Sequence, residues 1–203
     1  MRTARTSYLI PALVLAAAVG TAIAAGTAPA AASAAASAVS AASLAHPDQF
    51  TGSLVNTVAG ARFSQPFILS VDHYAGDAEV HRFTGLLAEK GPYSLRDELW
   101  KHSAGYLRIG GRIGYPVAAV LSQDTATGRK LTVVLNRPLS PFEVQSYARS
   151  SMYPFTVLEL DLDQSGAGHG TLIGAAKMQM HGDTLTIESL GIQPLRLLAV
   201  RAS

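Results

Sequence analysis

The chain of 203 residues carries 16 Lys and Arg against 14 Asp and Glu, which gives a formal charge of +2, and it has no cysteine. The absence of cysteine excludes disulfides, thiolate metal sites and a cysteine nucleophile. With so small a net charge, there is no electrostatic reason to expect binding to nucleic acid or to an anionic membrane.

Residues 1–24 have the pattern of a secretory signal peptide. Arg2 and Arg5 precede the apolar run Tyr8–Val19, and an Ala-Ile-Ala sequence at 22–24 fits the small-x-small rule for cleavage, although later alanines fit almost as well. The apolar run is shorter than the roughly 20 residues that span a bilayer, which favours cleavage over an uncleaved membrane anchor. We therefore expect an exported protein, periplasmic or extracellular, with no transmembrane span in the mature chain.

Residues 25–49 consist mainly of Ala, Ser, Thr, Gly and Pro, with no apolar stripe that a helix could bury. This composition is typical of a flexible tether. Residues 50–203 are enough for one domain with an apolar core. The predicted organisation is a signal peptide, a tether and a single β-rich domain.

The pattern of the domain is mostly that of strands and turns, with one pair of helices that are adjacent in sequence. The helices are predicted from Asp77 to Gly91 and from Ser94 to His102, because each has a capping residue and apolar side chains at helical spacing. Glycines at 110, 111 and 114 indicate a bulge, a bend or a close backbone approach. The predicted strands are Phe50–Ala61, Pro66–Ala75, Tyr106–Arg112, Pro116–Ser122, Arg129–Asn136, Phe155–Asp163, Thr171–His181, Thr184–Leu190 and Leu195–Ala202.

The clearest strand is Phe155–Asp163, in which leucines at 158, 160 and 162 alternate with acidic residues at 159, 161 and 163. Successive strand residues point to opposite sides of a sheet, so this strand has one dry and one wet face. Gln164–Gly168 then supplies the glycines of a turn. We predict that the domain is built around this hairpin.

The predicted fold class is mainly β, or α+β by element count. Short connections in the second half require antiparallel pairing, and the last three strands are predicted to form a meander. An antiparallel sheet of eight or nine strands closes as a barrel or folds as a sandwich. The helix pair is expected to plug one end or cover one face.

Three segments carry a resemblance to a family of exported bacterial proteins of unknown function. They are Gly128–Pro138, with its GR and RP pairs, the run from Arg149 to Met178, with its YPF and acidic strand, and the closing Gly191–Arg201. The resemblance covers roughly Phe67–Arg201. It implies an exported single domain and no particular activity, cofactor or catalytic residue.

One segment resembles the start of a calcium-binding loop. Asp161, Asp163 and Ser165 alternate and are followed by a glycine, as oxygen ligands of a hard cation do. However, the twelfth position is Leu172 rather than an acid, and no helix flanks the segment. The same residues fit the wet face of a strand and an ordinary turn, so we predict a hairpin turn and no metal site. No cofactor is expected.

The connection at 137–153 is long and polar for a compact domain, which is typical of functional loops and Ω-loops. It contains Arg149 and ends at Tyr153, and Phe155 lies two residues further on. An Arg beside two aromatic residues at a barrel mouth is suited to an anionic or aromatic ligand. The alternative is structural, with the Arg binding loop carbonyls and the rings closing the core.

Three functions stay open at this point. The first is a non-enzymatic exported domain that binds a small apolar or amphipathic ligand, because the strand count fits a barrel and the helices could form a lid. The second is an envelope module that contacts a protein or polysaccharide. The third is a barrel-type isomerase or cyclase, which requires a titratable group in a cavity.

Overall fold

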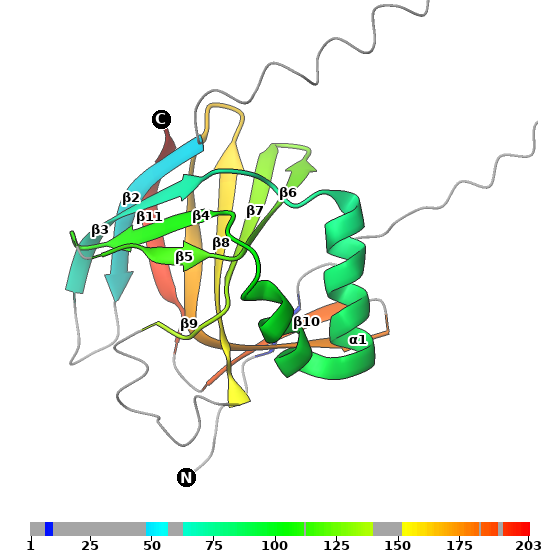
Figure 1. Ribbon diagram of the computed structural model, residues 1–203. Helices are drawn as coiled ribbons and strands as arrows, with labels where there is room; N and C mark the ends of the chain where they lie inside the picture. The colour runs from blue at the N-terminus through cyan, green and yellow to red at the C-terminus, as the bar shows by residue number, and fades with distance from the viewer. Residues whose placement is uncertain are drawn as a thin grey trace, which may run out of the picture.

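The computed structural model describes residues 7–9, 48–56, 63–111, 113–139, 152–182, 184–190 and 193–203. These residues form one helix and an antiparallel sheet (Figure 1). The elements are β1 (Ser7–Leu9), β2 (Asp48–Asn56), β3 (Phe63–Val71), α1 (Asp77–Leu99), β4 (Gly105–Ile109), β5 (Tyr115–Val117), β6 (Ala119–Thr125), β7 (Gly128–Leu135), β8 (Phe155–Asp163), β9 (Ala167–His181), β10 (Thr184–Ser189) and β11 (Leu195–Ala202).

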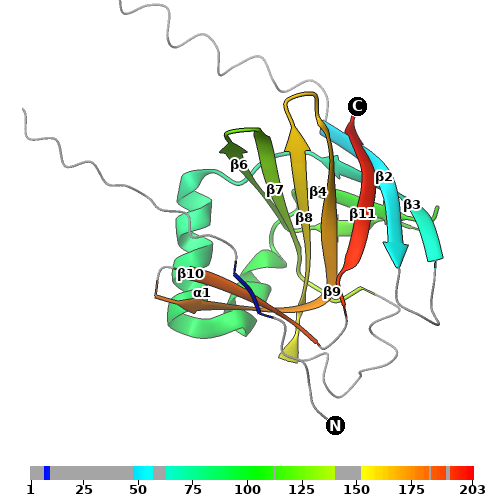
Figure 2. The same ribbon diagram turned by 180° about the vertical axis from the view of Figure 1, so that it is seen from behind.

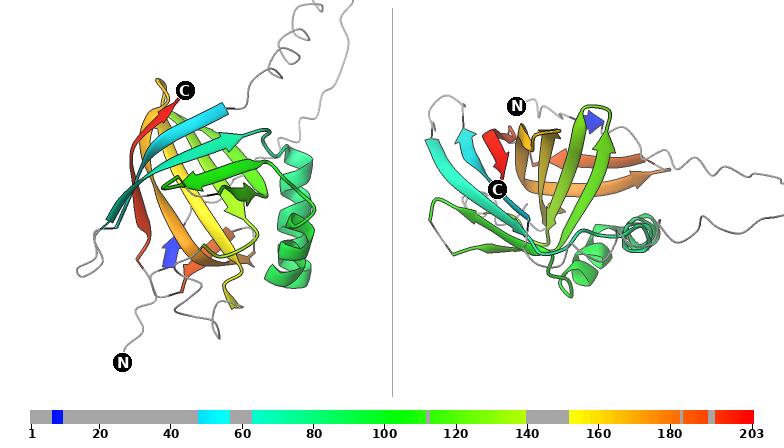
Figure 3. Two further views of the ribbon diagram at one scale, coloured as in Figure 1. Left: turned by 60° about the vertical axis from the view of Figure 1, so that its left-hand side comes forward. Right: turned by 90° about the horizontal axis from the view of Figure 1, so that it is seen from above.

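The sheet is nearly closed as a barrel. Its strand order is β5-β4-β3-β2-β11-β9-β8-β7-β6, so β5 and β6 stand at opposite ends of that order. In the chain, however, the same two strands are separated by Ala118 alone, whose N–H donates to the carbonyl oxygen of Val134 on β7 at 2.9 Å. The sheet must therefore curl back on itself, as the view from above shows (Figure 3). The expected antiparallel sheet is confirmed, and of the two closures it is the barrel.

The inward face of the barrel is apolar. On β8 the leucines at 158, 160 and 162 belong to one buried cluster with inward residues of the other strands, and the acids at 159, 161 and 163 face outward. Phe50, Phe67 and Leu197 have at most 2% of their surface exposed. Burial of apolar surface at about 25 cal/mol per Å² is the main force that holds the barrel closed.

Glycines let neighbouring strands come close in this barrel. A Cβ on Gly52 would lie 2.7 Å from the ring of Phe67, so the glycine makes room for that ring in the interior. A Cβ on Gly170 of β9 would overlap the carbonyl oxygen of Glu159 on β8. Larger residues at these positions would force the strands apart, since protein interiors have little free volume.

The predicted helix pair is a single kinked helix, α1. Gly91 lies inside α1 with φ of 79°, and Pro92 follows it, so the two arms meet at a break in the helical geometry. Side chains of both arms, among them Phe83 and Leu99, pack on the outer face of β6, β7 and β9 (Figures 1 and 2). Between α1 and the sheet there is a small cavity of about 60 Å³. In the described part of the chain, no helix combines the length and apolarity needed to cross a membrane.

The predicted meander of the last three strands is wrong. β11 pairs with the first part of β9, at residues 167–172, and with β2, whereas β10 pairs with the last part of β9, at residues 176–181. The register between β8 and β9 shifts between Phe155 and Val157. Beyond this bulge β9 runs on with β10 beneath α1 (Figure 2). The short loops were predicted correctly, but β9 is long enough to pair with β11 along its first part and with β10 along its last part.

Two glycine substitutions should have opposite effects on stability. Gly170→Ala should lower the free energy of unfolding by about 1–3 kcal/mol, because the added Cβ meets the backbone of β8. Gly85→Ala in α1 should raise it by up to about 1 kcal/mol, because no atom outside the helix lies within 4 Å of the new Cβ and Ala is the better helix former. Urea unfolding followed by circular dichroism measures both. A Gly170→Ala protein as stable as the parent would contradict the close approach of β8 and β9.

Candidate functional site

The residues predicted around the long connection occupy different environments. Arg149 lies outside the described residues. Tyr153 is half-buried. Phe155 is fully buried and faces away from the barrel interior, in the apolar cluster under α1 that also contains Phe83 and Ala176. Its ring is thus part of the contact between sheet and helix, and the suggestion that these three residues recognise a ligand stays a prediction.

The segment that resembles a calcium loop is the β8–β9 turn, organised by one carboxylate. Oδ1 of Asp163 accepts hydrogen bonds from the N–H of Ser165 at 2.8 Å, its hydroxyl at 2.6 Å, and the N–H of Ala167 at 3.1 Å. These bonds, that of the Ser165 hydroxyl first, hold the pKa of Asp163 below its usual value. Asp161 is exposed on the outer face of β8. Within the described ranges, no three His, Asp or Glu side chains are grouped so as to hold a metal ion.

A polar cluster caps one end of the barrel. The hydroxyl of Tyr74 donates to Oδ2 of Asp48 at 2.5 Å, and Nη1 of Arg129 lies 3.8 Å from the same oxygen. The guanidinium of Arg129 also lies over the rings of Phe50 and Tyr74, 5.7 and 5.5 Å from their centroids. Burial, together with the bond to Asp48, raises the pKa of Tyr74 well above its usual range, so at neutral pH the phenol is a hydrogen-bond donor.

Sequence reasoning missed this cluster because its members are far apart in the chain. Arg129 is in phase with the inward-facing Leu131 and Val133 of β7. An arginine in phase with core residues at a strand end was the available signal, and it was not used. Its charge is matched by Asp48 and its stem covers aromatic rings, so the arginine has a structural role.

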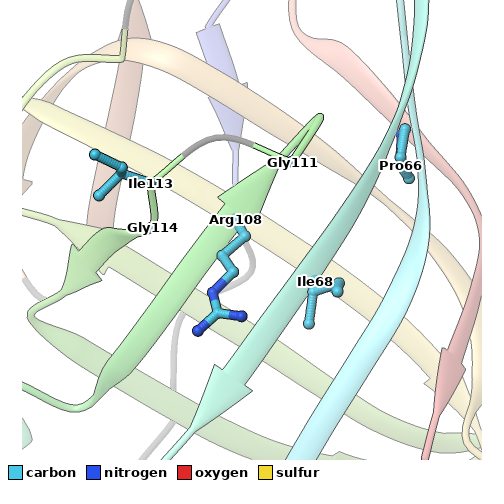
Figure 4. Close-up of a pocket in the computed structure, with 6 residues that line it drawn as sticks. All are labelled: Pro66, Ile68, Arg108, Gly111, Ile113 and Gly114. Atoms are coloured by element: carbon cyan, nitrogen blue, oxygen red, sulfur yellow. The ribbon is translucent and has the colours of Figure 1, made fainter.

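Two open clefts flank the connection between β4 and β5. The first measures about 520 Å³ and is shown in Figure 4. The second measures about 590 Å³ and is lined by residues of the same connection and of β5. Both are lined by Gly111, Ile113 and Gly114, and the first adds Pro66, Ile68 and Arg108 whereas the second adds Tyr115, Pro116 and Arg137.

The glycines predicted to mark a bend do so here. Gly110 and Gly111 have φ of 59° and 73°, in the left-handed region that glycine adopts without strain. A Cβ on Gly114 would lie 3.2 Å from Cγ of Arg108, so the glycine lets the connection pass close to the arginine stem. Next to these glycines, Ile113 has 93% of its surface exposed.

The two arginines of the clefts differ in their surroundings. The guanidinium of Arg137, which lines the second cleft, lies over the ring of Tyr115, 5.4 Å from its centroid. Arg108 is exposed on the outer face of β4, where it stands opposite Ile68 of β3 (Figure 4). The described lining residues therefore combine an apolar surface with positive charge.

The comparisons with known proteins do not bear on this site: no protein-family model, curated protein or solved structure matches the chain. The resemblance to a family of exported proteins accordingly stays a prediction.

Asp163→Asn should lower the melting temperature at pH 7, because an amide accepts the three turn hydrogen bonds less strongly than a carboxylate does. The folded pKa of Asp163 lies below its unfolded value, so its stabilising effect is present above the unfolded pKa and is lost as pH falls through the folded one. The difference between variant and parent should therefore shrink below about pH 4.

Thermal unfolding from pH 7 to pH 3 tests this, with Asp161→Asn, an exposed acid on the same face of β8, as the matched control. The control should melt close to the parent. If millimolar Ca²⁺ raised the melting temperature of the parent but not of Asp163→Asn, the carboxylate would be a calcium ligand and the turn interpretation would be wrong.

Proposed function

We propose that this protein is a binding module for a small apolar or amphipathic ligand, which it holds in the clefts beside the β4–β5 connection. The observation that carries the proposal is the exposure of Ile113 between two hollows with volumes of about 520 and 590 Å³. Ligand pockets are typically about 300–1,000 Å³.

The described barrel interior is packed with side chains, so the strand count no longer argues for a ligand inside the barrel, and the proposal places the site on the outer face instead. Inward-facing leucines, valines and phenylalanines from β2 to β11 form one buried cluster, including Leu107 on β4 and Val117 on β5, both with no exposed surface. An interior filled in this way leaves the sheet as a rigid support, and rigid elements position a binding site better than loops do.

The chemistry of the first cleft favours a ligand with an apolar part. Pro66 and Ile68 form one wall from β3, and Ile113 lies next to Gly114, across Arg108 from that wall (Figure 4). A fully exposed isoleucine gains about 1.5–3 kcal/mol when a ligand covers it completely. Backbone at Gly111 and Gly114 can approach such a ligand closely, since no Cβ stands in the way.

The test is a titration of the purified protein with the neutral fluorescent probe N-phenyl-1-naphthylamine. The parent should bind the probe with an increase in fluorescence. Ile113→Ser and Ile68→Ser should each weaken binding by about tenfold, because each removes most of an apolar contact worth about 1.5 kcal/mol.

Tyr93→Ser on α1 is the matched control, since Tyr93 is also exposed, at 47%, but does not line either cleft. It should bind the probe like the parent. If the parent did not bind the probe, or if all three variants lost binding equally, the clefts would not be the site. A partner protein captured only by the parent would instead favour the envelope module.

A further inference from the structure

We infer that the ligand of the first cleft is an amphiphile with one anionic head, a carboxylate or a phosphate, and that Arg108 binds this head. The inference rests on the proposed function and adds the charge of the ligand to it. It starts from the surroundings of Arg108, which lines the first cleft beside an apolar wall, whereas several other described cations have an acid beside them.

Several described cations have an acid at hand. Arg82 lies 3.7 Å from Glu98, Lys130 lies 3.3 Å from Glu159, and Arg129 is held by Asp48. Arg108, in contrast, is exposed and makes no ion pair or hydrogen bond with any residue of the described ranges. Its five N–H groups are therefore free to bind a planar oxyanion in bidentate geometry.

The face around Arg108 contains no competing acid. On β2, β3, β4 and β11 the outward residues are hydroxyl, amide, apolar or basic side chains, and no outward Asp or Glu occurs on these strands in the described part of the chain. A second arginine lies in the same cross-strand row, because Arg108 pairs with Ile68, Ile68 with Thr51, and Thr51 with Arg201. At about 4.8 Å per strand, the two arginines stand about 14 Å apart. The face thus has a positive potential that attracts anions.

The lining of the cleft fixes the rest of the ligand. Ile113 lies on the opposite side of Arg108 from β3, whereas Ile68 lies beside the guanidinium and Pro66 extends the apolar surface along β3 (Figure 4). A head bound at Arg108 would place a short hydrocarbon tail along these side chains. An inorganic anion would leave the apolar wall uncovered, and a neutral hydrocarbon would leave the arginine without a partner, so an amphiphile uses both features.

The experiment compares three ligands with the same tail: decanoate, decyl phosphate and decan-1-ol, each displacing N-phenyl-1-naphthylamine from the protein at pH 7.4. In the parent the anions should bind more tightly than the alcohol. Arg108→Gln should weaken binding of the anions about fivefold, as expected for an exposed charge pair, and should leave binding of decan-1-ol unchanged. The stronger of the two anions identifies the head group.

Arg196→Gln is the matched control, because Arg196 also faces outward but pairs with Val55, near the far end of β2 and three strands from Arg108. It should bind all three ligands like the parent. If decan-1-ol binds and Arg108→Gln leaves the anions unaffected, the inference is overturned while the proposed function stands. The same holds if Arg108→Gln weakens the alcohol and the anions equally, since Arg108 then shapes the cleft only. If no ligand displaces the probe, the proposed function itself fails.

Discussion

The structure depends on the strict alternation of side chains along strands that close on themselves. Every second residue of β2, β3, β7 and β8 points into the barrel, and on β11 a bulge separates the inward Leu197 from the inward Val200. The inward residues are leucine, valine, phenylalanine or glycine along most of these strands. Because the interior is filled by these side chains, the polar chemistry of the described chain is placed at the barrel ends and on the outer face. Substitutions of outward-facing residues can therefore change the function of the protein without loss of the fold.

The long strand β9 and the kinked helix α1 are the parts of the structure that depart from a simple barrel. β9 has 15 residues and extends beyond the barrel wall. The bulge opposite Phe155 lets its second part, residues 176–181, continue outside the wall and pair with β10. The outward side chains of Phe155 on β8 and of Met178 on the second part of β9 would be exposed without α1, which packs over them. The kink at Gly91 lets two arms of one helix cover a curved surface that a straight helix would touch only along a line.

The sequence predicted the strands and turns well where residues close together in the chain determine them. The bounds of β8 and β11 were predicted correctly, and the hairpin after β8 was found, because alternation and turn residues are local signals. The predicted pairing of β9 with β10 was correct, but that of β10 with β11 was wrong, because pairing depends on strand length and on a bulge at Phe155 that no local pattern reveals. The bend at Gly110 was also predicted, but the clefts beside it were not, since they need the pairing of β3 with β4 to bring Pro66 to the connection and the curling of the sheet to bring Arg137 there.

Two arginines of the sheet show how the direction of a side chain decides whether it needs a partner from its own chain. Arg129 and Arg108 are the same residue type in the same sheet, and each stands beside apolar side chains. Arg129 faces inward at a barrel end, where leaving its charge without a partner would be costly, and Asp48 and Tyr74 satisfy it. Arg108 faces water, which solvates it at no cost to the fold. An inward arginine needs a partner from its own chain, whereas an outward one can keep its hydrogen-bonding capacity for a ligand, and this difference follows from the direction of the side chain alone.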